Sequence, residues 1–245
     1  MQVFYQPETP QLLSLTEEES KHCARVLRHR AGDTIWVTNG RNQLFECQLK
    51  DANPTRCSFT IISEKEQAAR PYSIHLAIAP TKNTDRLEWM LEKCVELGID
   101  QVSLLLCQHS ERVKINPDRL YKKAVSAMKQ SLNFQMPRIH EPVGYRAFID
   151  SLADENIHKF IAYVDEEPRS HLMQAAGSHH DYCILIGPEG DFSNEEISVA
   201  LEHDLKPVSL GPSRLRTETA GLAACHILNL INQVPAPDKT DTSGC

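Results

Sequence analysis

Apolar runs change in length and spacing along the chain near residue 70. Before that point the runs are short, with the strand-like sequences TIWVT at 34–38, QLFECQLK at 43–50 and SFTIIS at 58–63. Asn39 and Gly40 lie between the first two runs, and this turn chemistry is typical of a β-hairpin. The first 65 residues are therefore predicted to be mostly β, assembled as a compact β-barrel-like module.

One helix is predicted within this β region. Thr16 and Glu19 have the spacing of a capping box, and Cys23 and Leu27 follow at helical spacing. We expect a short helix that runs to about His29.

After a polar stretch at 65–72, apolar β runs alternate with helical patterns. This order is typical of a mainly parallel sheet covered by helices on both faces. Strands are expected at Ile74–Ala79, Val102–Leu106, Phe160–Val164, Tyr182–Ile186 and Val208–Leu210. The chain is thus predicted to have an N-terminal domain at 1–70, an α/β domain at 73–234 and a disordered polar tail at 235–245.

Capping and breaking residues mark the helices of the second domain. Gly98 ends the first helix, Asn116 with Pro117 opens the second, and a capping box starts the third at Ser193. The last helix is expected from about Thr219. The apolar face of the first helix is predicted to be core and consists of Leu87, Met90, Leu91, Cys94 and Val95.

The composition is that of a globular protein, with 245 residues of which 41% are hydrophobic and 24% charged. The eight cysteines form no C-x-x-C pair and the eleven histidines no H-E-x-x-H motif, so we expect reduced thiols and no bound metal. His179 and His180 are expected in a solvated loop.

No apolar run approaches the roughly 20 residues that span a bilayer, and no signal-peptide pattern is present, so we expect a cytoplasmic protein.

The net charge of −7 argues against binding nucleic acid through bulk electrostatics. The charge is uneven, because residues 1–70 hold nine basic and nine acidic side chains whereas the rest hold 17 and 24. Within the neutral part, a basic cluster falls inside ten residues and consists of Lys21, Arg25, Arg28, His29 and Arg30. From charge alone, a solvated helix face is the simpler interpretation.

Two loops rich in glycine and proline follow predicted strands and precede helices. The first is IGPEGDFS at 186–193, and the second is LGPSRLRTETA at 210–220. Open α/β sheets bind ligands at the carboxyl ends of their strands, and glycines let the backbone approach a ligand closely. Such a loop is often only a connection, however. Neither the P-loop motif G-x-x-x-x-G-K-[ST] nor the dinucleotide-binding motif G-x-G-x-x-G occurs, which argues against the usual classes of ATPase and dehydrogenase.

The second loop has charges that a helix start does not explain. Thr217 or Thr219 could cap the last helix, and Glu218 suits the helix dipole there. Arg214 and Arg216 do not suit this position, because the helix dipole disfavours cations in a first turn. Unfavourable placement of this kind often marks a functional site.

The order of segments along nearly the whole chain closely resembles the RsmE family of bacterial methyltransferases. The segments are the N-terminal β-module followed by KNTDRLEWMLEKCVELGID, HSERVKI, AVSAMKQSLNFQMP, LIGPEGDFSNEE and LGPSRLRTETA. The resemblance implies S-adenosylmethionine-dependent methylation of N3 of one specific uridine in 16S ribosomal RNA of the small subunit. The exact nucleotide, and whether the substrate is free rRNA or the assembled subunit, are left open.

The resemblance also implies an α/β fold, with an N-terminal PUA-like RNA-binding β-barrel and a C-terminal SPOUT α/β domain that contains a trefoil knot. Family members are homodimers whose active sites form at the subunit interface. The loops of the knot hold the methyl donor, with the turn after Val164 as a third wall. The corresponding donor-binding residues are Gly187, Pro188, Glu189, Gly190, Leu210, Gly211, Leu215, Arg216 and Thr219.

Methylation of uridine N3 requires loss of its proton while negative charge develops on the flanking carbonyl oxygens. Arg216 is the candidate for stabilising that charge, because a guanidinium stays charged and offers paired donors. Glu218 is the candidate either to accept the proton or to orient Arg216. Given the PUA resemblance, phosphate contacts are expected from Arg25, Arg28 and Arg30.

The chain departs from the family pattern at Asp191, where a second glycine usually follows GPEG. A positive φ angle there would cost more for aspartate than for glycine. The segment SAMKQSLNFQMP also lacks an arginine commonly found after its Gln-Ser. Two other functions stay open: a SPOUT methyltransferase acting on another RNA position or a ribose 2′-OH, and a non-catalytic PUA RNA-binding protein.

Overall fold

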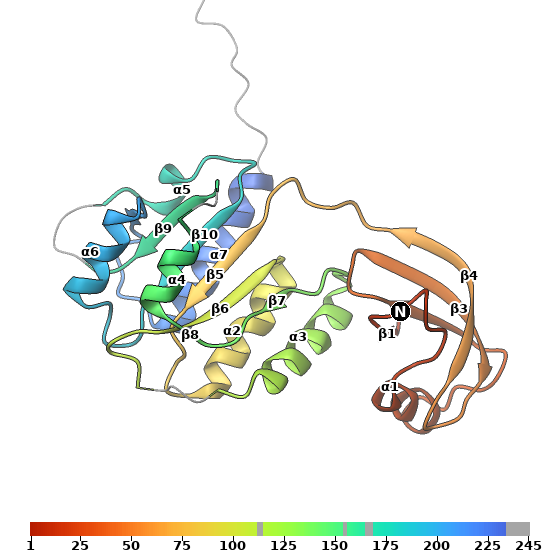
Figure 1. Cartoon of the computed structure of the whole chain (residues 1–245). Coiled ribbons are helices and arrows are strands. Elements are labelled where there is room, and N and C mark those ends of the chain that lie inside the picture. Colours follow the sequence, from red (N-terminus) through yellow and green to blue (C-terminus); the bar gives the residue numbers. More distant parts are fainter. Residues whose placement is uncertain (112–114, 154–155, 165–168, 234–245) are drawn as a thin grey trace, which may run out of the picture. The chain divides into compact units, whose positions relative to one another are not determined.

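The computed structural model describes residues 1–111, 115–153, 156–164 and 169–233 (Figure 1). The predicted tail at 235–245 lies outside them. By internal contacts the chain divides into two compact units. The first consists of Met1–Arg70, Leu91–Asp100 and Asn116–Ile139, and the second of the described parts of Pro71–Met90, Gln101–Ile115 and His140–Cys245.

The first unit contains a sheet of four strands in the order β1-β2-β3-β4. Strand β1 (Val3–Tyr5) is parallel to β2 (Thr34–Thr38), and β3 (Gln43–Asp51) is antiparallel to both β2 and β4 (Ser58–Glu66). The predicted hairpin is confirmed, and Gly40 in its turn has a φ angle of 73°. The core of this unit is apolar and includes Phe4, Ile35, Val37, Phe45, Leu49 and Phe59.

The predicted helix near the N-terminus is α1 (Glu17–Lys21), and a π-helical turn at His22–Val26 continues it. The Thr16 side chain caps α1 by accepting a hydrogen bond from the Glu19 N–H at 3.3 Å. The predicted second hydrogen bond of the capping box, from the Thr16 N–H to the Glu19 carboxylate, is wrong. The Glu19 carboxylate instead accepts from Lys129 Nζ at 2.5 Å, because a cation is a stronger partner than the backbone N–H of Thr16.

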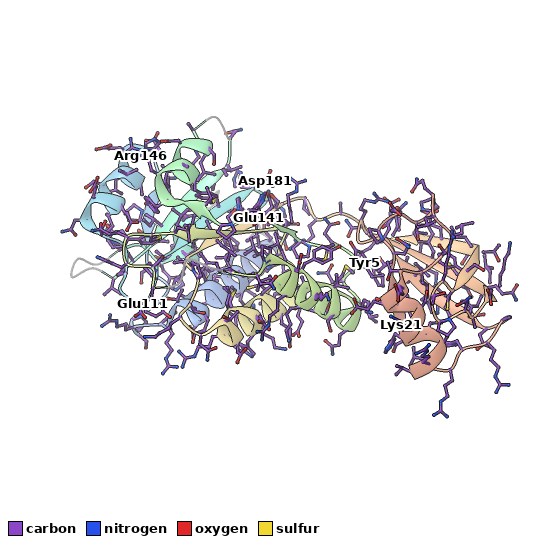
Figure 2. All side chains as sticks on the ribbon, turned by 60° about the horizontal axis from the view of Figure 1, so that its bottom comes forward. Tyr5, Lys21, Glu111, Glu141, Arg146 and Asp181 are labelled. Atoms are coloured by element: carbon purple, nitrogen blue, oxygen red, sulfur yellow. The ribbon has the colours of Figure 1, made fainter. Side chains whose placement is uncertain are left out.

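Helix α3 (Pro117–Ser131) groups with the N-terminal sheet by its contacts. Asn116 is its N-cap, as expected. Tyr121 on this helix lies 3.0 Å, Oη to Oη, from Tyr5 of β1, which is labelled in Figure 2. The short strand β7 (Arg138–Ile139) belongs to the same unit.

The second unit contains parallel strands in the order β11-β9-β10-β5-β6. A strand occurs near each of the five predicted positions, but the ends differ, and β11 shares only Val208 with the predicted strand. The observed strands are β5 (Ile74–Ile78), β6 (Gln101–Leu106), β9 (His158–Ala162), β10 (Tyr182–Ile186) and β11 (Lys206–Val208). A short strand, β8 (Val143–Gly144), also pairs with β6.

Helices cover both faces of this sheet, as predicted (Figure 1). Helices α4 (Tyr145–Ser151) and α6 (Asn194–Glu202) pack on one face, and α7 (Thr217–Gln233) packs on the other. A Cβ atom added to Gly221 would lie 2.8 Å from Ile78 Cδ1, so α7 approaches β5 closely at this position. The short helix α5 (Leu172–Ala175) contacts α7.

The predicted helix signals are largely confirmed. Helix α2 (Thr84–Leu97) ends before Gly98, whose φ angle is 96°, and its predicted core residues are buried. The capping box of Ser193 and Glu196 starts α6. Helix α7 begins at Thr217, slightly before the predicted Thr219.

No helix in the described part of the chain is long and apolar enough to cross a bilayer. Seven cysteines are free and buried, and Cys245 lies outside the described residues. Within those residues no three His, Cys, Asp or Glu side chains gather as potential metal ligands.

Candidate active site

A cavity of about 800 Å³ opens in the second unit at the ends of β9, β10 and β11. This is the carboxyl edge of the parallel sheet, where ligands of open α/β folds bind. Its volume lies within the roughly 300–1,000 Å³ of small-molecule sites. Three segments form its walls: residues 162–164 with Arg169, residues 186–189 with Asp191, and residues 208–217 with Ala220.

Most of the predicted donor-binding residues line this cavity: Gly187, Pro188, Glu189, Leu210, Gly211, Leu215 and Arg216. Gly190 and Thr219 do not line it. Asp191, Thr217 and Ala220 also line it, and they lie in the two predicted loops without being among the predicted donor-binding residues. Sequence reasoning missed Tyr163 and Arg169, which lie outside those loops.

The β10–α6 loop is shaped by two glycines. A Cβ atom at Gly187 would lie 3.1 Å from the ring of Phe192, and one at Gly190 would lie 3.1 Å from His109 Cβ. The absence of a side chain at Gly190 therefore lets the loop pass close to His109, and Gly190 itself does not line the cavity.

Glu189 fixes the same loop from outside. Its Oε1 accepts a hydrogen bond from the Lys82 N–H at 3.0 Å. The side chain of Lys82 pairs with Glu111, labelled in Figure 2, at 2.8 Å, and this carboxylate raises the pKa of Lys82. The cavity wall is thus tied to the segment after β5.

Asp191 closes the loop with a φ angle of 64°, the left-handed conformation. Its Oδ1 accepts from the Phe192 N–H at 2.8 Å, and its Oδ2 accepts from the Val164 N–H at 3.0 Å. Because Val164 belongs to a different wall of the cavity, the carboxylate connects two walls.

The segment between β11 and α7 is bonded to both neighbouring walls. The Ser209 N–H donates to Ser170 O at 3.0 Å, and the Leu172 N–H donates to Ser209 O at 2.9 Å. The Thr217 hydroxyl donates to Gly187 O at 3.1 Å. The predicted threonine cap is therefore wrong: Thr217 lies inside α7, and its hydroxyl donates to the neighbouring loop.

Arg216 and Glu218 lie in different environments. Arg216 is exposed and lines the cavity, whereas Glu218 is only 6% exposed. Glu218 Oε1 lies 3.7 Å from Nη1 of Arg86, and its Oε2 has no hydrogen-bond partner among the described residues. The structure thus pairs Glu218 with Arg86, an arginine that sequence reasoning did not connect with the site.

The third wall contains a cation–π contact. The Arg169 guanidinium carbon lies 4.4 Å from the ring centre of Tyr163. No motif or spacing in the sequence indicates this pair.

The three arginines predicted to contact RNA lie together in the first unit. Arg25, Arg28 and Arg30 are exposed around the π-helical turn, and Arg28 has a φ angle of 58°. Val26 beside them is 65% exposed. This surface offers guanidinium groups next to an apolar side chain.

Family models match both parts of the chain. A model described as an RNA methyltransferase domain matches residues 68–229, which include every segment of the cavity. A model described as an RNA methyltransferase PUA domain matches residues 15–62. The chain therefore has the domains of an RNA methyltransferase with an N-terminal PUA domain.

Individual relatives narrow this class. Ribosomal RNA small subunit methyltransferase E of Rickettsia conorii is 27% identical over 225 residues, which are 89% of this chain and 90% of the relative. The crystal structure of a probable rRNA-methyltransferase from Porphyromonas gingivalis is 41% identical with a TM-score of 0.87, covering 95% of this chain and 98% of that one. Ribosomal RNA small subunit methyltransferase E from Neisseria gonorrhoeae, solved bound to S-adenosyl methionine, is 26% identical with a TM-score of 0.81, covering 95% and 98%. The chain belongs to the RsmE family of ribosomal RNA methyltransferases.

Proposed function

We propose that this chain transfers a methyl group from S-adenosylmethionine to N3 of a specific uridine in 16S ribosomal RNA. The observation that carries the proposal is the cavity at the carboxyl edge of the methyltransferase domain. A relative of the same fold was solved with S-adenosyl methionine bound. The choice of uridine N3 follows from the family resemblance of the two C-terminal motifs.

The cavity residues fit such a donor in size and chemistry. Gly187 and Gly211 carry no side chain at the cavity, so backbone groups can approach a flat adenine ring. Apolar walls for the ring and ribose come from Val164, Leu210 and Leu215. When bound, the donor supplies a methyl group on a cationic sulfonium, which is an excellent leaving group.

We propose that the C-terminal segment forms a trefoil knot and that the N-terminal sheet belongs to a PUA-like barrel, as the family resemblance implies. Strand β11 lies at one edge of the sheet beside β9, yet α7 returns to pack on β5 and β10. The connecting residues 209–217 are hydrogen-bonded to Ser170 and Leu172 on one side and to Gly187 on the other. Passage between two other loops is what such a knot requires.

Arg216 is proposed to stabilise the negative charge that develops on the uracil oxygens as N3 loses its proton. Its guanidinium is exposed at the cavity, where it can reach a base next to the donor. Glu218 is proposed either to accept the N3 proton or to orient Arg216. The unbonded Oε2 of Glu218 supports the first role, although this buried carboxylate is not among the residues that line the cavity.

Arg25, Arg28 and Arg30 are proposed to hold rRNA phosphates, with the small subunit or its rRNA as the partner.

We also propose that the chain acts in the cytoplasm as a homodimer, as the family resemblance implies. Light scattering after size exclusion tests the dimer, and a monomeric mass would contradict it.

The donor proposal is tested by calorimetric titration of S-adenosylmethionine into the purified protein. We expect saturable binding with about one donor per cavity. A titration without binding heat, repeated at a second temperature, would contradict the proposal and favour the non-catalytic RNA-binding alternative.

A further inference from the structure

Asp191 stands where the family usually has a glycine, and the structure keeps the backbone conformation that glycine favours. Its φ angle of 64° is left-handed, a region that carries a cost for residues other than glycine. The side chain therefore has to contribute something that offsets this cost.

Four hydrogen bonds converge on Asp191. Its backbone N–H donates to Pro188 O at 2.9 Å, and its backbone oxygen accepts from His109 Nδ1 at 3.0 Å. Its carboxylate accepts from the N–H groups of Phe192 and Val164 at 2.8 and 3.0 Å. A glycine could make only the first two.

The bond to Val164 is the one that joins separate parts of the cavity. Val164 follows β9, whereas Asp191 follows β10, and both residues line the cavity. Hydrogen bonds to an ionised acceptor are about twice as strong as neutral ones. The carboxylate thus holds the end of the β9 wall at a fixed distance from the β10–α6 loop.

We propose that Asp191 is a positioning residue of the donor site, which preorganises the wall at Val164 for S-adenosylmethionine. The proposal rests on the donor function proposed above. It predicts that the carboxylate raises the affinity for the donor. Without it, donor binding would have to order the wall at Val164, which costs binding free energy.

The variant Asp191→Gly removes the carboxylate and keeps the left-handed backbone without strain. The loss of a charge-assisted hydrogen bond predicts donor affinity lower by about tenfold or more. We expect the KM for the donor to rise correspondingly, with kcat at saturating donor little changed. Asp191→Asn should recover part of the affinity, because its amide oxygen can accept one of the two bonds.

Asp204 provides a matched control. It is also an aspartate in the left-handed conformation, with a φ angle of 61°, but it is exposed and does not line the cavity. Asp204→Gly makes the same change of residue type and should bind S-adenosylmethionine like the wild type.

Calorimetry with S-adenosylmethionine on all four proteins decides the matter. Wild-type affinity in Asp191→Gly would overturn the inference, as would equal weakening in Asp191→Gly and Asp204→Gly. If the wild-type chain itself does not bind, the donor function fails and this inference fails with it. Binding by the wild type with no loss in Asp191→Gly overturns the inference alone.

Discussion

At the scale of single residues, Arg216 and Glu218 are close in sequence at the start of α7 but differ in exposure and partners. The arginine is exposed at the cavity, and the glutamate is buried beside Arg86. The two roles proposed for Glu218, proton acceptor and support for Arg216, predict different behaviour when both residues are replaced.

We expect Arg216→Ala and Glu218→Gln each to lower kcat, measured at saturating donor, about a hundredfold or more. Because Glu218 pairs with Arg86 rather than Arg216, the two losses should multiply in the double variant. Methyl transfer from labelled donor to small subunits measures this, with the exposed Glu202→Gln as the control. A double variant no slower than Arg216→Ala would instead show that Glu218 acts through Arg216.

The sequence could predict the cavity loops because glycine and proline act locally. Their Gly and Pro residues marked both loops as possible ligand loops, and the family resemblance assigned Gly187 and Gly211 to the donor; both line the cavity. The partners of Glu218 and Asp191 could not be predicted. Arg86 and Val164 are brought to them by chain folding, and no local pattern encodes that approach.

At the scale of elements, strand β5 carries a half-buried histidine, His75. His75 Nε2 lies 2.8 Å from Ser103 Oγ on β6, and its ring centre lies 5.5 Å from those of His140 and Phe148. Burial, with a smaller contribution from His140, lowers the pKa of His75 to about 4. The stability of the folded chain should therefore depend on pH.

Unfolding exposes His75 and returns its pKa to about 6.5. As pH falls from about 6.5 to about 4, the unfolded chain takes up a proton that the folded chain does not, so stability falls. The full difference corresponds to roughly 3 kcal/mol. Urea unfolding between pH 7 and pH 4 should show wild type losing stability relative to His75→Gln, whereas the exposed His226→Gln should follow the wild type. Parallel curves for wild type and His75→Gln would contradict the account.

The long elements could be predicted, and several short ones could not. Strand β10 and helix α2 have apolar patterns long enough to specify their type, and both appear where expected. Helices α4 and α5 have seven and four residues, too few for a periodic pattern to specify. Neither the grouping of α3 with the N-terminal sheet nor the knot that we propose has any periodic signature.

At the scale of the whole molecule, an acidic chain is proposed to bind RNA. The net charge of −7 arises entirely outside residues 1–70, so the matched PUA domain is not opposed by its own charge. Local arginines, not overall charge, are then expected to provide the phosphate contacts.

Replacing Arg25, Arg28 and Arg30 together by glutamine should weaken binding to 16S rRNA and reduce its salt dependence. If each arginine neutralises one phosphate, the slope of log affinity against log salt should fall in magnitude by about 2 to 3. Filter binding over a range of salt concentrations measures this. Arg146→Gln, on the exposed surface of α4 (Figure 2), is the control. An unchanged slope would place the RNA contacts elsewhere.

The central claim is tested most directly by mapping methylated nucleosides in 16S rRNA. Small subunits from cells lacking this protein are incubated with S-adenosylmethionine and either the wild type or Arg216→Ala, and the rRNA digests are compared by mass spectrometry. We predict 3-methyluridine at a single position with the wild type and far less with the variant. Methylation at another atom, or no new methylated uridine, would contradict the account.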